Sequence, residues 1–367
     1  MTLGLLVVAV AGAVYLAIAA VRLLQFAMRP IELARDFLPT ISVLKPVAGI
    51  EPNLYRNLAS FCEQDYDARY EVIFCLASAN DPALPTVQRV VADFAWCPAA
   101  IALGRAPGML NPKIANVAKA GVEPQGEIVV IADSDIRVDR KYLRALAAGF
   151  ASERVGAITC LYSGEPNDGI VSRLGALQIQ DQFAPSVLVA LALGALRFCL
   201  GATMAVRRRV LDDIGGLAAL GDHLADDHKL GELVAQRGYE VELCRYPVRT
   251  DVNEITLAAL WSHELRWART HRALAPAGYA FSFLTFALPL ALLYLIFGGN
   301  RAAAIPLLAS VLALRVAVHY VARYAFGAAR DDVALIVPRD LLSLAVWAAS
   351  LFGRTVRWRG RIYRTGS

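Results

Sequence analysis

The feature that most constrains this chain is an uncharged apolar run close to its start. Residues 3–21 contain no charged side chain. Because a helix of about 20 apolar residues spans the hydrocarbon core of a bilayer, we predict a membrane helix here. No positive segment precedes the run and no small-residue cleavage site follows it before Arg22, which favours an anchor over a removed signal peptide. Arg22 and Arg29 follow the run, so the positive-inside rule predicts a cytoplasmic location from residue 30 onward.

The composition indicates further membrane segments towards the C-terminus. Hydrophobic residues make up 57% of the chain and charged residues only 19%, and the mean hydropathy of +0.47 is high for a soluble protein. Residues 279–298 carry no charge and are predicted to span the membrane. Residues 302–322 form a second candidate span, interrupted by Arg315 and His319. Residues 341–352 are short, and we expect an interfacial helix there, because a full span would place the arginine-rich tail outside.

One apolar stretch, residues 183–200, is interrupted by Pro185 and Arg197, and we interpret it as interfacial. The six cysteines form no C-x-x-C pair, and several lie in apolar runs, so buried and reduced thiols are expected. The net charge is only +5, and the sequence lacks the basic and aromatic runs that indicate nucleic-acid binding. The basic residues cluster near apolar segments, which fits contact with anionic membrane lipids.

Between these segments, from about residue 38 to 250, the pattern predicts an α/β domain. Short apolar runs rich in strand-forming residues alternate with helical patterns such as 52–62 and 82–94. The predicted strands are residues 40–46, 70–77, 99–103, 127–132 and 156–162. This alternation indicates a parallel sheet covered by helices on both faces. Ligands bind such sheets beyond the carboxyl ends of the strands, where Asp81 and Asp133 are expected.

The stretch EIVVIADSDIRVD, residues 127–139, ends a predicted strand with two carboxylates one residue apart. If the strand continued, Asp133 and Asp135 would point to the same side. Their mutual repulsion would then be relieved by a divalent cation, and Mg²⁺ or Mn²⁺ would bridge them to phosphate oxygens. The alternative is an Asp-Ser-Asp turn with local hydrogen bonds.

Residues 221–237 predict a helix that ends near Gly238 and carries Asp226 and Asp227 in its first turn. Acidic residues there stabilise the helix dipole. A carboxylate at a helix start that faces a cleft is also suited to act as a general base. Both interpretations remain open from the residues alone.

A second helical stretch, HELRW at residues 263–267, comes directly before the apolar C-terminal segments. Trp267 stands where a zinc motif H-E-x-x-H would need a second histidine. His263, Arg266 and Trp267 lie on nearly one helical face, where arginine is suited to a pyrophosphate and tryptophan to a sugar or lipid. The alternative is an interfacial helix with snorkelling arginines.

Taken together, seven motifs in this order resemble a known family. They are VLKP (43–46), SANDPAL (78–84), NPKIAN (111–116), ADSDIRV (132–138), GATMAVRR (201–208), LADDHKL (224–230) and HELRW (263–267). The chain resembles the ceramide glucosyltransferase-like family of membrane-anchored, inverting glycosyltransferases with a GT-A fold. Residues 263–293 are most similar to the bacterial hopanoid-associated branch. The domains implied are a membrane anchor at residues 1–28, a GT-A domain at 38–272, membrane helices at 276–353 and a basic cytoplasmic tail at 354–367.

The resemblance also implies roles for individual residues. The implied ligands of the nucleotide sugar are Lys45, Asp81, Lys113, Asp133 and Asp135. Asp133 and Asp135 would also hold the metal ion, Mg²⁺ or Mn²⁺. Asp227 matches the family's catalytic base better than Asp226 does. Arg266 and Trp267 match the closing motif that contacts diphosphate or acceptor, whereas His263 replaces the Gln or Arg that usually opens it.

The activity implied is metal-dependent transfer of a sugar from a UDP-sugar to a lipid hydroxyl by one inverting displacement. The branch favours a hopanoid acceptor with N-acetylglucosamine, and glucosylceramide synthesis is the alternative. A processive polysaccharide synthase is a further alternative, although such enzymes usually have more membrane spans. A scaffold without activity would be expected to have lost the acidic motifs. The implied location is the bacterial inner membrane, with the catalytic domain in the cytoplasm.

Overall fold

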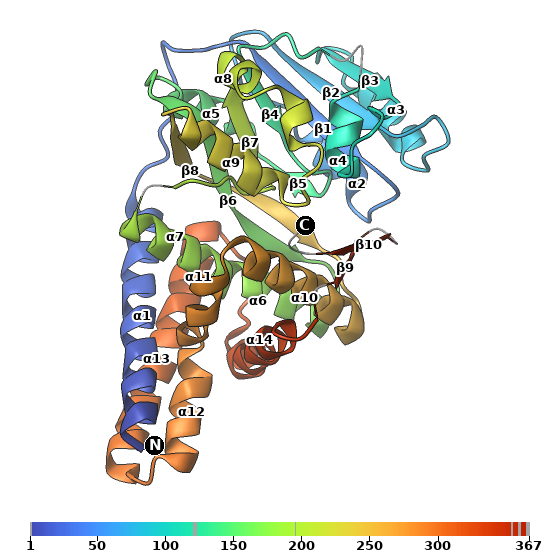
Figure 1. Cartoon of the computed structure of the whole chain (residues 1–367). Helices are drawn as coiled ribbons and strands as arrows, with labels where there is room; N and C mark the ends of the chain where they lie inside the picture. Colours follow the sequence, from blue (N-terminus) through green and yellow to red (C-terminus); the bar gives the residue numbers. More distant parts are fainter. Residues whose placement is uncertain (1, 120–122, 195, 354, 359–360, 365–367) are drawn as a thin grey trace. The chain divides into compact units, whose positions relative to one another are not determined.

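The computed structural model describes residues 2–119, 123–194, 196–353, 355–358 and 361–364. The chain divides into two compact units. The first, which we call the sheet unit, comprises Pro30–Tyr162 and Gly194–Asp251. The second, the helical unit, comprises Met1–Arg29, Ser163–Leu193 and Val252–Ser367. The ribbon of each unit is drawn in Figure 1.

The sheet unit is built on eight strands in the order β3-β2-β1-β4-β7-β6-β8-β5. Their bounds are β1 Ile41–Val47, β2 Tyr70–Leu76, β3 Ala99–Leu103, β4 Ile128–Ile131, β5 Ile136–Arg137, β6 Val155–Pro166, β7 Met204–Arg207 and β8 Glu240–Val252. The first four strands in that order pair in parallel, but β7 pairs antiparallel with both β4 and β6. The expectation of a wholly parallel sheet was therefore wrong. Residues Met204–Arg207 were not predicted as a strand. They form β7, which lies beside β4 and runs in the opposite direction.

Helices cover both faces of this sheet, as the apolar runs predicted. These helices are α2 Leu54–Ala59, α3 Leu84–Asp93, α4 Pro112–Val117, α5 Tyr142–Gly149, α8 Arg208–Asp213, the 3-10 helix η2 Leu217–Leu220 and α9 Asp226–Gln236. Alternate residues of one strand enter different cores, because successive side chains point to opposite faces. Val43 packs in one apolar cluster and Leu44 in the other. All six cysteines are buried and free, which confirms the expectation of buried thiols.

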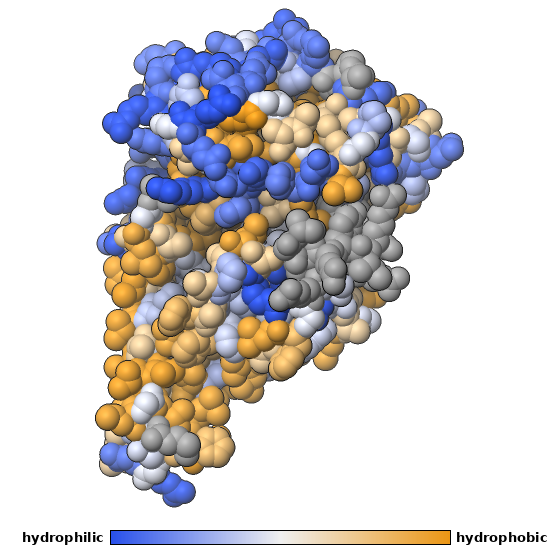
Figure 2. All heavy atoms as spheres, viewed as in Figure 1, coloured by the Kyte–Doolittle hydropathy of each residue, from blue (hydrophilic) through white to orange (hydrophobic). Residues whose placement is uncertain are grey.

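The helical unit consists mainly of long apolar helices. They are α1 Thr2–Met28, α6 Ile170–Gln178, the π-helix η1 Ile179–Phe183, α7 Ala184–Leu193, α10 Leu257–Leu274, α11 Pro276–Phe281, the 3-10 helix η3 Ser282–Thr285, α12 Ala287–Phe297, α13 Arg301–Phe326, the 3-10 helix η4 Val333–Leu335 and α14 Ile336–Ser350. A short hairpin follows, with β9 Thr355–Trp358 and β10 Arg361–Arg364. By length and composition, four helices among the described residues could cross a membrane, or five if one bent pair counts as a span. Figure 2 shows apolar side chains over α1 and α12.

The N-terminal helix packs closely against two later helices of its unit. Ala9 of α1 lies in an apolar cluster with Leu290 and Tyr294 of α12 and Ala304 of α13. A Cβ atom on Gly12 would lie 3.1 Å from the Cα atom of Ala287, so a larger residue would push the helices apart. Within lipid the hydrophobic effect does not drive helices together, so their association depends on close van der Waals packing. Small residues such as Gly12 allow this packing.

Three expectations for the apolar segments need correction. Residues 279–298 form no straight helix, because the chain bends by 64° between Pro276–Thr285 and Ala287–Phe297. The short helix expected at 341–352 begins earlier, and Val333–Ser350 is long enough to cross a membrane. The stretch 183–200 is helical only to Leu193, where it ends a candidate span that starts at Ile170. The π-helix at Ile179–Phe183 widens this helix just before Pro185.

Candidate active site

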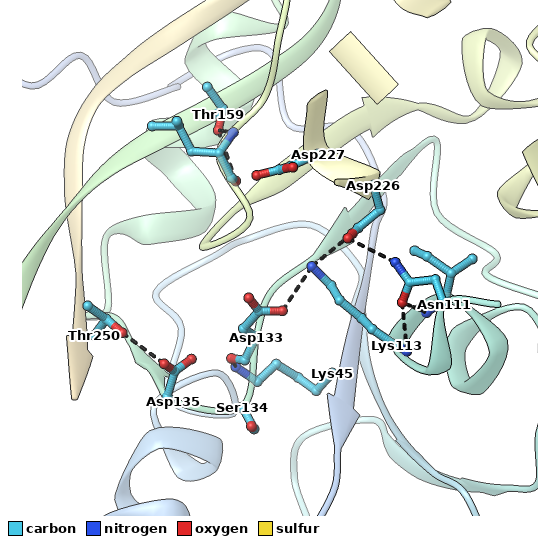
Figure 3. A network of polar contacts seen from close by, with 12 residues as sticks. Lys45, Asn111, Lys113, Asp133, Ser134, Asp135, Thr159, Asp226, Asp227 and Thr250 are labelled. Carbon is cyan, nitrogen blue, oxygen red and sulfur yellow. Dashed lines mark hydrogen bonds and ion pairs between the residues drawn. The ribbon is translucent and has the colours of Figure 1, made fainter. Parts of the chain in front are cut away.

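The two carboxylates of the D-S-D stretch lie in a turn at the carboxyl edge of the sheet. Strand β4 stops at Ile131, and the backbone amide of Ile136 donates a hydrogen bond to the carbonyl of Asp133 at 3.2 Å. The strand therefore does not continue to Asp135, which was the condition for both carboxylates to point the same way, and the stretch forms the turn that was the alternative. Asp133 Oδ1 lies 2.9 Å from Lys113 Nζ, whereas Asp135 Oδ2 accepts a hydrogen bond from Thr250 Oγ1 at 2.9 Å (Figure 3).

Asp135 lies close to other negative charges. Burial, together with the nearby carboxylates of Asp133 and Glu51, raises the pKa of Asp135 to about 7. The hydrogen bond from Thr250 and the charge of Lys45 oppose this rise without cancelling it. The turn therefore holds negative charge that a cation would stabilise.

Lys45 lies beneath this turn. Its side chain is fully buried, donates a hydrogen bond to the backbone carbonyl of Asp133, and has its ammonium 3.9 Å from the centre of the Phe61 ring. Burial lowers the pKa of Lys45 to about 7, against the opposing effect of the Asp135 and Asp133 carboxylates. Lys45 therefore supports the backbone of the D-S-D turn from inside the sheet unit.

Lys113 connects the turn to the start of α9. Its ammonium lies 2.9 Å from Asp133 Oδ1 and 3.0 Å from Asp226 Oδ2. Burial acts to lower the pKa of Lys113, but the two carboxylates raise it above its ordinary value. Lys113 is therefore a permanent cation between two acidic groups from different elements, as Figure 3 shows.

Asn111 explains why Lys113 lies there. Its side-chain oxygen caps α4 by accepting hydrogen bonds from the amides of Lys113 at 2.9 Å and Ile114 at 3.3 Å. Its amide group donates to Asp226 Oδ1 at 3.2 Å and to the carbonyl of His223 at 2.9 Å. The Asn111 side chain thus fixes both the start of α4 and the position of the Asp226 carboxylate.

The two aspartates that begin α9 have different surroundings. Asp226 is 6% exposed and is engaged by Lys113 and Asn111. Asp227 Oδ1 accepts a hydrogen bond from the amide of His228 at 2.8 Å. Burial and the Asp226 carboxylate raise the pKa of Asp227 to about 6, against the effect of Lys113. Asp227 is the member suited to accept a proton near neutral pH. The predicted helix end is confirmed, since Gly238 follows α9 with a positive φ of 83°.

Gly201 leaves space beside these acids. A Cβ atom on this residue would lie 3.5 Å from Asp227 Oδ2, 3.6 Å from Asp133 Oδ2 and 3.9 Å from Lys113 Nζ. The carboxylates of Asp133 and Asp227 therefore border on one small space, although their residues are far apart in the sequence. The backbone amide of Cys199 donates to the carbonyl of Asp227 at 3.1 Å, which holds this segment against α9.

Asp81 lies in the loop after β2 and joins the neighbouring loop after β1. Its Oδ1 atom accepts hydrogen bonds from the amides of Gly49 and Ala83, both at 3.0 Å. In the loop after β1, Glu51 Oε1 accepts a hydrogen bond from Ser134 Oγ at 3.2 Å. Asp81 thus connects to the D-S-D turn through a loop and not by its own side chain.

The HELRW residues lie on α10, which belongs to the helical unit. The Nδ1 atom of His263 forms a hydrogen bond with Glu254, and its ring meets that of Trp267 edge to face at 4.5 Å. The predicted clustering of His263 and Trp267 on one face is therefore confirmed. Glu264, between them in the sequence, is buried against Arg339.

Sequence reasoning missed four residues of this arrangement: Asn111, Gly201, Glu51 and Thr250. Asn111 before Pro112 is a helix-start signal that could have been recognised. Thr250 and Glu51 carry no local signal, because only strand pairing and loop packing bring them to Asp135 and Ser134. Gly201 could not be distinguished from a glycine in an ordinary turn.

The donor groups of this site can be compared with those that a divalent metal ion requires. Within the described part of the chain, no group of three or more His, Cys, Asp or Glu side chains is arranged to hold a metal ion. Mg²⁺ commonly takes only one or two protein carboxylates and completes its shell with phosphate oxygens and water. Asp135 supplies a hard oxygen donor whose negative charge lacks full compensation. These residues therefore fit a metal that binds together with a diphosphate.

Comparison with known proteins gives three results. The family model described as Glycosyl transferase family 21 matches residues 4–367. The chain is 26% identical over 240 residues to ceramide glucosyltransferase 1 of Caenorhabditis elegans, covering 65% of this chain and 51% of the relative. It is 34% identical over 127 residues to a ceramide glucosyltransferase of Gibberella zeae, covering 32% of this chain and 24% of the relative. The chain thus spans about half the length of the Caenorhabditis elegans relative.

Among solved structures, the fold is similar to a mannosyltransferase, PcManGT from Pyrobaculum calidifontis, in complex with GDP-Man and Mn²⁺. The TM-score is 0.52 at 19% identity, covering 95% of this chain and 99% of that one. At this identity the likeness concerns the fold alone. The sheet unit has the mixed α/β arrangement of GT-A glycosyltransferases.

Proposed function

Because this chain belongs to glycosyl transferase family 21, we propose that it transfers a sugar from a UDP-sugar to the hydroxyl group of a lipid. The observation that carries the proposal is the space beside Gly201, which Asp133, Asp227 and Lys113 border together. The space lies at the carboxyl edge of the sheet, where GT-A and other α/β proteins bind ligands. Asp81 and Lys45 complete the proposed donor site, the first through its loop contacts and the second beneath the D-S-D turn.

In the proposed reaction, Asp227 accepts the proton of the acceptor hydroxyl as a general base. The acceptor oxygen forms a bond to the anomeric carbon while the bond from that carbon to the phosphate oxygen breaks. UDP leaves with the electron pair, and the configuration inverts because attack and departure occur on opposite faces. The pKa of Asp227, raised to about 6, suits a base that must be deprotonated at neutral pH and still attract a proton.

Charge on the departing diphosphate needs compensation. Lys113 supplies one fixed cation, already 2.9 Å from Asp133. Asp133 and Asp135 would hold Mg²⁺ or Mn²⁺, which adds Lewis-acid stabilisation when bound. On α10, Arg266 and Trp267 are proposed to contact the diphosphate or the acceptor, and His263 to orient Trp267 through their edge-to-face contact.

For the acceptor, we propose a hopanoid polyol that receives N-acetylglucosamine, because residues 263–293 resemble the hopanoid-associated branch. Ceramide with glucose is the second candidate, and the curated relatives, which are named ceramide glucosyltransferases, favour it. The apolar helices support a membrane location. We propose the bacterial inner membrane with the catalytic domain, residues 38–272, in the cytoplasm.

The test uses the full chain purified in lipid nanodiscs with Mn²⁺ or Mg²⁺. UDP-N-acetylglucosamine and UDP-glucose are each combined with a hopanoid polyol or with ceramide, and products are identified by mass spectrometry. A hexosamine-hopanoid product supports the first candidate and a glucosylceramide product the second. Asp227→Asn should bind UDP as the wild type does but transfer at least about 1,000-fold more slowly. Wild-type rates in this variant would show that the base is elsewhere.

A further inference from the structure

One member of the HELRW stretch faces away from the others. Leu260 and Glu264 are the buried residues of α10, one helical turn apart. His263 and Trp267, by contrast, are partly exposed. Since Glu264 is only 8% exposed, it is not available to a ligand from solvent. Its charge must therefore be compensated inside the helical unit.

That compensation comes from Arg339 of α14. Arg339 is fully buried and donates two hydrogen bonds to the Glu264 carboxylate, at 2.7 Å to Oε1 and 2.8 Å to Oε2. It donates two more, to the carbonyl of Leu174 on α6 at 3.3 Å and to Ser343 Oγ at 3.1 Å. A bidentate pair of this kind fixes both distance and orientation, because the guanidinium and carboxylate planes must match. Arg339 thus ties α10 to α6 and α14.

The next residue of α14 forms a pair of the same type with a different helix. Asp340 accepts two hydrogen bonds from Arg315 of α13, both at 2.8 Å, and one from Gln182 at 2.8 Å. Both members of this pair are buried. Among the hydrogen bonds that the structure records for Arg315 and Asp340 in the described chain, none involves α10. Gln182 and Ser343 link Asp340 to Arg339 by hydrogen bonds, but neither Arg315 nor Asp340 has a recorded hydrogen bond to Glu264. The Arg315–Asp340 pair therefore serves as the control for removing a buried ion pair of the same unit that does not hold Glu264.

We propose that Glu264 and Arg339 are positioning residues that set the rotation of α10 about its axis and thereby the direction of Arg266 and Trp267. The proposal rests on the proposed function, in which those two side chains contact the substrates. Each residue of a helix turns by about 100°, so holding Glu264 also fixes the residues two and three positions later. A buried ion pair is seldom needed for stability, since apolar replacements are often neutral. An apolar pair would not reproduce the geometric restraint that the Glu264–Arg339 ion pair places on α10.

The test replaces each pair by apolar residues of similar size. The variants are Glu264→Leu with Arg339→Met and, as the control, Asp340→Leu with Arg315→Met. Thermal unfolding, UDP affinity, kcat and acceptor KM are measured for the full chain in nanodiscs. The first variant should keep its unfolding temperature within a few degrees but lose at least tenfold in kcat/KM. A fall in UDP affinity would place Arg266 at the diphosphate, whereas a rise in acceptor KM alone would place Arg266 and Trp267 at the acceptor. The control should keep its unfolding temperature within a few degrees and its UDP affinity, kcat and acceptor KM within twofold.

Wild-type kcat/KM in the folded first variant would overturn the proposal, as would an equal loss in the control. If the apolar pair does not fold, the charge-exchanged variant Glu264→Arg with Arg339→Glu replaces it. That variant should transfer faster than Glu264→Arg alone, and no recovery would contradict the inference. Failure of the proposed function is a separate result, since the wild type would then transfer sugar to neither lipid.

Discussion

Lys113 and Asp133 form an ion pair of 2.9 Å between Nζ and Oδ1 at the carboxyl edge of the sheet. Lys113 is at the same time 3.0 Å from Asp226. One ammonium thus joins the D-S-D turn, which carries the proposed metal-binding groups, to the first turn of α9, which carries the proposed proton acceptor.

The first prediction concerns the removal of this cation. Lys113→Met leaves the buried carboxylate of Asp226 without its charge partner, so we expect the free energy of unfolding to fall by about 3 kcal/mol. UDP affinity should fall as well, because a positive charge beside the diphosphate is lost. Denaturant unfolding and UDP titration measure the two effects. Lys113→Arg keeps the charge and should retain most of the stability. An unchanged unfolding midpoint in Lys113→Met would mean that the pair contributes nothing to folding.

The second prediction concerns pH. Asp227 must be ionised to accept a proton, and its pKa is about 6. As the pH falls below that value the carboxylate becomes protonated, so log kcat/KM should fall by roughly one for each pH unit. The profile is measured between pH 5 and 8 at constant ionic strength. UDP affinity measured over the same range is the control for loss of donor binding. A rate that rises on acidification is incompatible with Asp227 as the base.

The third prediction concerns Gly201. A methyl group here would enter the space between Asp133 and Asp227 at ordinary van der Waals distances, so Gly201→Ala should fold normally. It should nevertheless slow transfer by about 100-fold, because reacting groups displaced by about 1 Å lose that much rate. Gly231→Ala is the contrasting variant, since its Cβ would lie 2.3 Å from Phe198 Cα and should lower the unfolding temperature. Full activity of Gly201→Ala would mean that no substrate occupies the space.

The fourth prediction concerns the metal. EDTA should abolish transfer, and Mn²⁺ or Mg²⁺ should restore it. With UDP present, the metal should raise the unfolding temperature of the wild type, by an amount equivalent to about 2.7 kcal/mol at 100 times its Kd. Asp135→Asn should lose this stabilisation because a carboxylate ligand is removed, whereas Asp212→Asn, far from the turn in sequence on α8, should keep it. Equal UDP affinity with EDTA and with metal would contradict a shared site.

Local patterns predicted much of the fold. Strands β1, β2, β3 and β4 lie within one or two residues of the predicted runs, because each is a short apolar segment. β1 and β4 are buried along their whole length, whereas β3 lies at the edge of the sheet and is only partly buried. The start of α9 at Asp226 was predicted by the acidic residues of its first turn. Strands β5, β7 and β8 were missed, since their place in the sheet depends on partners far away in the sequence.

Candidate site residues were recognisable by type, but their partners were not. The acidic motif of the predicted strand end pointed to Asp133 and Asp135, and the family resemblance selected Asp227 over Asp226. That Lys113 would join Asp133 to Asp226 could not be predicted, because three separate segments meet there. Likewise Arg339 and Asp340 directly precede the apolar run 341–352, yet both are buried and paired with other helices.

By itself, the sequence determined which segments are apolar, which strands enter a sheet core and which carboxylates end them, because hydrophobic periodicity and charge are local properties. Only the tertiary structure decided which of Asp226 and Asp227 is paired with Lys113, that the D-S-D carboxylates diverge, and that Glu264 faces inward. Those outcomes depend on which side chains meet across distant segments, and the energy of a buried charge is set by the neighbours that folding brings to it.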